Sequence, residues 1–251
     1  MRNFWDHALL LTAVFIFCGP VVWMLSSALL PGAIGANWQS LSSQLSGEAS
    51  GAALDRMILV TLALATTVSV LSTVMSFLAA YAFVYLQGVF LPACFWLAVL
   101  TLYFPVEARM LHTFDVVAHL GLTSSLTGIA LPVLQLGLGT LFFRQHLKRL
   151  PREVFEAARI DAAGPLRCLF EIAVPLSWRA GAAVALVTFI LGWNQYLWPL
   201  MASVDDRHWT LVRGLERVRS GSGAGLLLAS FSLLPPLLLV VLFRRVQLVP
   251  D

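Results

Sequence analysis

The chain has 251 residues, of which 59% are hydrophobic and only 12% are charged, whereas soluble domains carry about 25% charged residues. This composition excludes an ordinary soluble enzyme and indicates a membrane protein. The formal net charge is +3. Because the basic residues cluster beside apolar stretches, where they set topology and contact anionic lipid, this positive charge does not indicate a nucleic-acid partner.

Uncharged stretches predict where the chain crosses the membrane. A span needs roughly 20 residues to cross about 30 Å of hydrocarbon. The stretches without Asp, Glu, Lys or Arg are 7–30, 57–106, 116–143, 180–204 and 220–243. The second is long enough for two spans, which a turn in the sequence YLQGVFLP divides. The sequence therefore predicts an all-α membrane protein with six transmembrane helices in a single domain, residues 1–251.

The segments between the spans have different characters. Residues 31–54 are small, polar and rich in glycine, and we expect an external loop there. The sequence VEARMLHTFDVVAHLGL, residues 106–122, mixes charged and apolar residues and predicts a short helix on the outer surface. The outer segment 205–225 ends in SGSGAG, which we expect to be a flexible loop rather than a phosphate-binding one, because it lacks the Gly-Lys-Ser/Thr ending.

The segment 144–179, between the fourth and fifth spans, is predicted to fold into helices. Pro151 suits the first turn of a helix. Good helix formers follow through Ala163, and Gly164 with Pro165 ends the helix before a second short one over 166–173. The first helix has a shallow apolar face with charged flanks. The face comprises Val154, Ala157, Ala158, Ile160 and Ala162, and the flanks comprise Glu153, Glu156, Arg159 and Asp161. Such a face suits a groove on a partner protein or a fold back onto the chain's own spans, and the pattern leaves both open.

The distribution of basic residues predicts the orientation. Lys and Arg are enriched in cytoplasmic segments. If both termini and the segment 144–179 are cytoplasmic, most of the 16 Lys and Arg residues lie inside. These are Arg2, Arg144, Lys148, Arg149, Arg152, Arg159, Arg167, Arg179, Arg244 and Arg245. We therefore expect a multi-pass protein with both termini in the cytoplasm.

The sequence EAARIDAAGPLRCLFEIAVP resembles the EAA loop of bacterial ABC-importer permeases. It departs from the family pattern at Ala162, where the family has Gly, and at Val174, where the family has Leu. The resemblance implies that this loop docks on an ATPase subunit and couples nucleotide-driven motion to the spans. The coupling residues that it implies are Glu156, Ala157, Ala158, Asp161, Gly164, Ile172 and Pro175.

More of the chain is similar to the carbohydrate-type permeases of the maltose and glycerol-3-phosphate importers, and the glycerol-3-phosphate type is the more similar. The segments FPVEARMLHTFDVVAHLGL, GWNQYLWPL and LLPPLLLVVLF carry this resemblance. It implies a bacterial inner-membrane protein with a homologous second permease subunit, an ATPase dimer that binds ATP and Mg, and an external substrate-binding protein. It implies a small phosphorylated polyol such as glycerol 3-phosphate as substrate, with a neutral sugar such as maltose or trehalose as the alternative. No cofactor is expected in this chain.

Polar residues in the spans are candidates for the substrate pathway. Asn194, Gln195 and Tyr196 fall in the outer half of the fifth span, and Gln135 falls in the fourth. Amides at that depth must face protein or a water-filled path. Alternatively, the amides bond to neighbouring helices while Trp193 and Trp198 belong to the interfacial aromatic belt.

Functions of other classes have weaker support. A membrane-embedded enzyme needs a catalytic group within the spans, and no catalytic or metal-binding pattern is present. A scaffold without transport activity also stays open as an alternative. A secondary carrier usually needs buried ionisable residues, which the spans lack.

Overall fold

The computed structural model describes residues 2–45, 54–86, 88–104, 106–134, 136–218 and 221–247. Within these ranges the chain forms helices and turns, and no strand, so the prediction of an all-α protein is confirmed. Three helices are long and apolar enough to cross a membrane. Three bent pairs of helices pass the same test when each pair is taken as one span, which gives up to 6 candidate spans in the described ranges.

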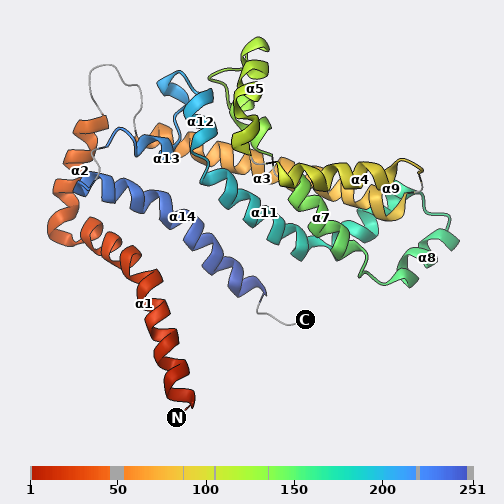
Figure 1. Cartoon of the computed structure of the whole chain (residues 1–251). Helices are drawn as coiled ribbons and strands as arrows, with labels where there is room; N and C mark the ends of the chain where they lie inside the picture. Colours follow the sequence, from red (N-terminus) through yellow and green to blue (C-terminus); the bar gives the residue numbers. More distant parts are fainter. Residues whose placement is uncertain are drawn as a thin grey trace.

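Figure 1 shows an elongated molecule built of helices. The longer ones are α1 (Arg2–Leu29), α2 (Pro31–Leu45), α3 (Leu54–Tyr85), α4 (Leu91–Leu100), α5 (Val106–His119), α7 (Leu136–Leu147), α8 (Arg152–Ile160), α11 (Trp178–Trp193) and α14 (Gly223–Gln247). The shorter ones are α6 (Leu126–Ala130), α9 (Pro165–Cys168), α10 (Val174–Leu176), α12 (Leu197–Ala202) and α13 (Leu211–Gly214). A π-helical turn, Leu169–Ala173, joins α9 to α10. Helix α14 returns to lie beside α1 and α2 (Figure 1).

Helix α3 is the centre of the fold, and α7 and α11 pack along it. Small side chains on α3 allow this close approach. The Ser69 hydroxyl donates a hydrogen bond of 2.7 Å to the carbonyl of Ala185, and the Ser76 hydroxyl donates one of 2.9 Å to the carbonyl of Leu136. These two serines therefore connect α3 to both neighbouring helices.

Buried side chains form clusters along α3. The Leu54-end cluster includes Met57 and Ala65 from α3 together with Trp193 and Trp209. A middle cluster contains Leu64 and Val68 of α3 with Trp198. The Tyr85-end cluster joins Ala80 and Tyr81 to residues of α7, α8 and α11, and its full membership is Ala80, Tyr81, Phe143, Leu147, Phe155, Leu169, Ala173, Ala180 and Val184.

Helix α1 diverges from the body of the molecule, and its most apolar 18-residue window contains no buried residue, whereas Ala28 near its end is buried in the Leu54-end cluster. The next segment corrects a prediction, because residues 31–45 of the expected external loop form α2. Pro31 begins this helix, as a residue without a backbone N–H can. Leu41 and Leu45, four residues apart, are buried in the Leu54-end cluster, and that spacing places them on one helix face.

Two predicted spans are interrupted. The fourth was expected to begin at Val116, but residues 106–119 form α5, at 107° to the helix before it, and the bent pair α6–α7 follows. The predicted helix on 106–122 is therefore present, whereas the start of the fourth span was wrong. The fifth was expected to be continuous to Val204, but α11 ends at Trp193 and α12 begins at Leu197. The outer segment 205–225 contains the short helix α13, and its SGSGAG stretch, expected to be a flexible loop, includes the start of α14 at Gly223.

Candidate functional site

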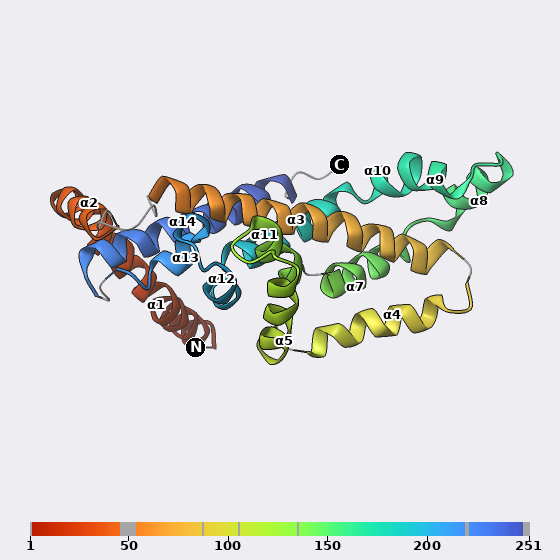
Figure 2. The ribbon, with the colours of Figure 1, turned by 90° about the horizontal axis from the view of Figure 1, so that it is seen from above.

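The segment predicted to contact an ATPase lies at the far end of the molecule, beyond the Tyr85 end of α3 (Figures 1 and 2). Its first helix, α8, begins after Pro151, as predicted, but ends at Ile160 rather than at Ala163. Ala162 adopts a left-handed conformation with φ of 52°. The Ala162 N–H donates to the carbonyl of Arg159 at 3.1 Å, and the Ala163 N–H donates to that of Ala158 at 2.9 Å. These two bonds are those of a Schellman helix end, which glycine usually forms.

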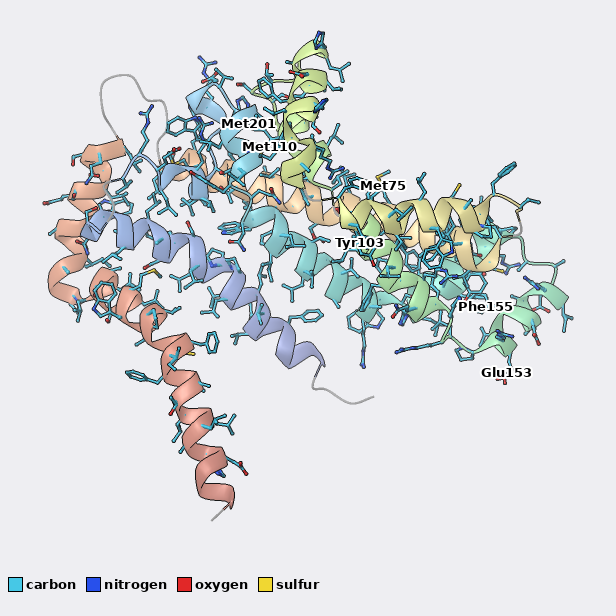
Figure 3. The ribbon with its side chains drawn as sticks, in the orientation of Figure 1. Met75, Tyr103, Met110, Glu153, Phe155 and Met201 are labelled. Atoms are coloured by element: carbon cyan, nitrogen blue, oxygen red, sulfur yellow. The ribbon has the colours of Figure 1, made fainter. Side chains whose placement is uncertain are left out.

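The side chains of α8 divide into a buried and an exposed set. Phe155 and Ala158 are buried, at 7% exposure each, whereas Val154, Ala157 and Ile160 are exposed. The predicted apolar face is therefore corrected, because Ala158 faces inward. Figure 3 shows Glu153 pointing away from the body, with Phe155 on the side of α8 that faces it. Phe155 was not among the predicted site residues, although it precedes Ala158 by three residues and so lies on the same helix face.

Two tyrosines at the end of α3 hold this loop. The ring of Tyr85 stacks on Phe155, with centroids 4.3 Å apart and planes at 24°. The Tyr85 hydroxyl donates to the carbonyl of Leu147 at 3.1 Å, and the Tyr81 hydroxyl donates to that of Pro165 at 2.8 Å. Because the tyrosines are one helical turn apart on α3, they contact the loop before and after α8.

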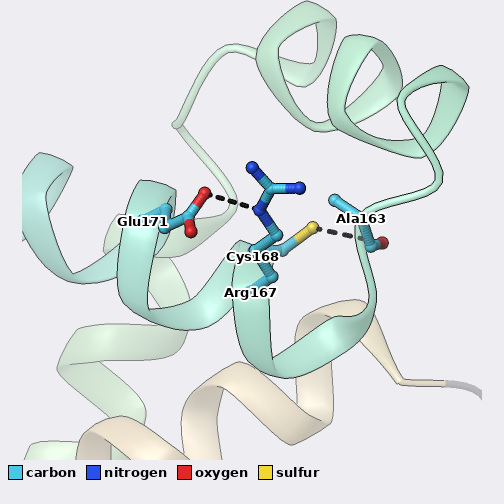
Figure 4. Close-up of polar contacts among 4 residues, drawn as sticks. All are labelled: Ala163, Arg167, Cys168 and Glu171. Atoms are coloured by element: carbon cyan, nitrogen blue, oxygen red, sulfur yellow. Dashed lines mark hydrogen bonds and ion pairs between the residues drawn. The ribbon is translucent and has the colours of Figure 1, made fainter.

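The turn between α8 and α9 has contacts of its own (Figure 4). The Cys168 thiol donates to the carbonyl of Ala163 at 3.8 Å, and the guanidinium of Arg167 donates to the carboxylate of Glu171 at 2.8 Å. The ion pair is exposed on both sides, so we expect it to contribute little to stability. The thiol is buried and fixes the chain where it leaves the helix end.

The seven residues predicted to couple to an ATPase lie in one loop but not on one surface. Glu156, Ala157, Asp161, Gly164 and Pro175 are exposed. Ala158 is buried, and Ile172 is half-buried against the Tyr85-end cluster. The first five can touch a partner, whereas the last two support the shape of the loop.

A hollow of about 490 Å³ lies between α8 and the ends of α3 and α7. Tyr85, Leu147 and Phe155 form its apolar part. Its charged lining residues are Lys148, Arg152, Glu156 and Arg159. The hollow limits the packing between α8 and the spans to the neighbourhood of Phe155.

The residues predicted to line a substrate pathway lie at the break between α11 and α12. Asn194 is exposed, and Gln195 and Tyr196 are half-buried. Within the described residues, the side-chain amides of Asn194 and Gln195 have no hydrogen-bond partner. The alternative in which these amides bond to neighbouring helices is therefore wrong for this structure. Gln135 lies outside the described residues.

The two tryptophans beside this break are buried rather than interfacial. Trp193 is 3% exposed and donates to the carbonyl of Ser232 at 2.8 Å. Trp198 is 1% exposed and donates to the carbonyl of Gly128 at 3.2 Å. They belong to different buried clusters. The break is thus fixed on both sides, which corrects the interpretation of these residues as an aromatic belt.

Arg213, near the same break, has a structural role. Its guanidinium donates to the carbonyl of Pro199 at 3.3 Å and to the carbonyl and hydroxyl of Ser203. The Trp209 ring lies 4.4 Å from the guanidinium of Arg213 and 4.3 Å from that of Arg217. Arg213 therefore braces the turn after α12 although it belongs to an outer segment.

Arg109 of α5 lines a separate cavity of about 620 Å³ between α3, α4 and α7. No group of three or more His, Cys, Asp or Glu in the described ranges is arranged to hold a metal ion. The absence of a cofactor from this chain stays a prediction.

Comparisons with known proteins agree with this arrangement. Residues 82–247 match the family described as "Binding-protein-dependent transport system inner membrane component". The chain is 37% identical over 216 residues to the sn-glycerol-3-phosphate transport system permease protein UgpE of Rhizobium meliloti (strain 1021), covering 82% of this chain and 77% of that protein. It is 41% identical over 195 residues to the UgpE of Pectobacterium atrosepticum, covering 75% of this chain and 69% of that protein.

A solved structure has the same fold. The crystal structure of a bacterial ABC transporter involved in the import of the acidic polysaccharide alginate contains a chain that aligns with a TM-score of 0.73. The alignment covers 97% of this chain and 96% of that one at 18% sequence identity. The family match includes both α8 and the break after α11. The chain is a multi-pass membrane protein of the binding-protein-dependent transport system inner membrane component family, a permease subunit rather than an enzyme.

Proposed function

We propose that this chain is the permease subunit of an ABC importer that moves glycerol 3-phosphate, or a related phosphorylated polyol, across the inner membrane by alternating access. The observation that carries the proposal is the identity of 37–41% to permeases named for glycerol 3-phosphate, over 75–82% of the chain. The family's name implies an external binding protein. ATP and Mg are bound by two copies of a separate ATPase subunit, and a homologous second permease completes the pathway.

Six spans and cytoplasmic termini fit this function. Each bent pair is counted as one span, and α8 then lies on the cytoplasmic side with the basic residues around it. A single domain of 251 residues contains all of these elements. Labelling tests the orientation: in a chain without its own cysteines, a membrane-impermeant thiol reagent added outside should label Ser43→Cys on α2 and spare Glu156→Cys on α8. The opposite pattern would reverse the topology.

The exposed residues of α8 dock on the ATPase subunit. Val154, Ala157 and Ile160 offer an apolar strip, and Glu156 and Asp161 offer charges at its edges. Closure of the ATPase dimer moves this helix as a rigid body. A difference of a few kcal/mol between the contacts in the inward-open and outward-open states is enough to shift the population of the spans.

The break between α11 and α12 lines the substrate pathway. Asn194 and Gln195 offer amide groups that have no hydrogen-bond partner in the described residues, and Tyr196 is half-buried beside them. Amides and a phenol bind polyol hydroxyl groups well. The buried tryptophans on both sides hold the amides in position while the spans move.

Uptake by the complete importer tests the proposed function. Proteoliposomes containing this chain, the second permease and the ATPase, with the binding protein outside, should accumulate labelled glycerol 3-phosphate when ATP is enclosed. Maltose and trehalose are the competitors, because the outer segments carry slightly more acidic than basic residues and so provide no broad attraction for an anion. If the importer takes up the disaccharide and not glycerol 3-phosphate, the proposed substrate is wrong and a neutral sugar takes its place. Uptake of neither, with no ATP hydrolysis, would favour a scaffold or a membrane-embedded enzyme.

A further inference from the structure

The attachment of α8 to the spans raises a mechanical question. Figures 1 and 2 place α8 beyond the end of α3, and of its residues only Phe155 belongs to the Tyr85-end cluster. The chain turns on both sides of the helix. Pro151 precedes it with ψ of 121°, and Ala162 follows it with φ of 52°.

Two turns connected by a short helix form a pivot. A force applied to the exposed strip of α8 can rotate the helix about these turns without moving α3, unless a non-covalent contact prevents that rotation. Packing does not prevent this rotation on the side of α8 that carries Arg152, Glu156 and Arg159, because the hollow separates that side from the spans. The stack of Tyr85 on Phe155, with centroids 4.3 Å apart, lies beside that hollow.

We propose that the Tyr85–Phe155 stack is the contact that transmits the movement of α8 to α3 and α7. This inference rests on the proposed function. Tyr85 is suited to that role because its ring contacts α8 while its hydroxyl donates to the carbonyl of Leu147, the last residue of α7. One side chain thereby connects three helices. Tyr85 and Phe155 are positioning residues, since neither touches substrate or nucleotide.

The experiment measures coupling separately from assembly. In the reconstituted importer, the ratio of glycerol 3-phosphate imported to ATP hydrolysed is compared for the wild type, Tyr85→Leu, Phe155→Leu and the double variant. Each single variant should keep its ATPase bound while the ratio falls by about fivefold, the loss expected for an aromatic pair. The double variant should fall no further than either single one, because both remove the same contact.

Matched variants separate the stack from general damage. Phe155→Tyr keeps both rings and the Tyr85 hydroxyl, so its ratio should stay close to that of the wild type. Tyr85→Phe keeps the ring stack but loses the bond to the carbonyl of Leu147, so its ratio should fall by less than that of Tyr85→Leu. Tyr103→Leu removes an exposed tyrosine, 79% accessible and far from α8, and should change nothing. If the Tyr85→Leu chain fails to accumulate in the membrane, Phe155→Leu tests the same contact from the loop side.

A distance measurement detects the pivot directly. Spin labels on Ile160 of α8, 86% exposed, and on Phe142 of α7, 46% exposed, should give a narrow distance distribution in the wild type and a broad one in Phe155→Leu. The inference would be overturned if both leucine variants kept the wild-type ratio of import to ATP hydrolysis and a narrow distribution of spin-label distances. Additive losses of that ratio in the double variant would also overturn it. An importer whose wild type shows no ATP hydrolysis in response to substrate would instead contradict the proposed function.

Discussion

The two ends of α3 are held in different ways. At the Leu54 end, the Leu211 N–H donates to the buried hydroxyl of Thr61 at 2.7 Å, and Arg213 bonds to the backbone near α12. At the Tyr85 end, Phe155 of α8 stacks on Tyr85, two tyrosine hydroxyls bond to the segments before and after α8, and a hollow lies beside the helix. Buried hydrogen bonds resist rearrangement because breaking them leaves unsatisfied polar groups. The molecule is therefore held rigidly beside the candidate pathway, whereas the helix beside the candidate ATPase surface can move more easily.

The largest expected effect comes from two glycines of α11 that lie toward opposite ends of α3. A Cβ atom at Gly192 would lie 3.1 Å from Cα of Ala65, whereas one at Gly181 would meet nothing within 4 Å. Gly192→Val should therefore destabilise the fold by about 1–3 kcal/mol through overpacking, and Gly181→Val should cost much less. Thermal unfolding of the purified proteins in detergent measures both. Equal losses would show that the two ends are packed alike.

Removal of the Arg213 guanidinium should have an effect of similar size. Arg213→Met removes the charged donor from the carbonyls of Pro199 and Ser203, and hydrogen bonds to charged groups contribute about 1.5–3 kcal/mol. Arg207→Gln is the control, because that arginine is 75% exposed and its carboxylate partner lies 3.7 Å away. A melting temperature unaffected by Arg213→Met would mean that the guanidinium does not brace α12.

At the other end, substitutions on α8 should separate docking from loop structure. Ala157 is exposed and Ala158 is buried. Ala157→Leu and Glu156→Lys should reduce ATPase binding about tenfold, which corresponds to about 1.4 kcal/mol, without changing thermal stability. Ala158→Leu should also loosen the loop, measured as faster proteolysis between α7 and α11. Full substrate-stimulated ATP hydrolysis in the Glu156→Lys variant would exclude this helix as the docking surface.

The smallest expected effect concerns Ala162. Its φ of 52° is strained for alanine but not for glycine, so Ala162→Gly should stabilise the helix end by about 0.4–1 kcal/mol. Hydrogen exchange of the Ala163 amide, which bonds to Ala158, should slow accordingly. Ala163→Gly serves as the control because Ala163 is not among the residues with positive φ. Faster exchange in Ala162→Gly would indicate that the left-handed turn is not maintained in solution.

The sequence predicted the helical class and most apolar segments, because long runs without charge have few alternatives. It also placed the start of α8, since Pro151 marks it locally. It could not predict the break after Trp193. That break depends on two tryptophans that donate to carbonyls 39 and 70 residues away in sequence, and a hydropathy pattern contains no such information.

The candidate coupling site was predicted in part. The family resemblance located α8, but the helix was expected to continue through Ala163, whereas Ala162 forms the left-handed turn that follows its end. The stack of Phe155 on Tyr85 joins residues 70 positions apart, on different helices. Their aromatic character was visible in the sequence, but their pairing depends on how α8 returns to α3. The α2 helix was not predicted because its glycines suggested a loop. Burial of Leu41 and Leu45 stabilises the helix by more than the glycines destabilise it.

Helix α1 has a consequence for biosynthesis. The most apolar 18-residue window of α1 contains no buried residue, and an isolated helix satisfies its own backbone hydrogen bonds in lipid. Because α1 precedes every other described helix, it can insert into the bilayer before α3 has been translated. Its stability there is then independent of the later packing of α3, α7 and α11, so variants that disrupt that packing should still leave α1 anchored in the membrane.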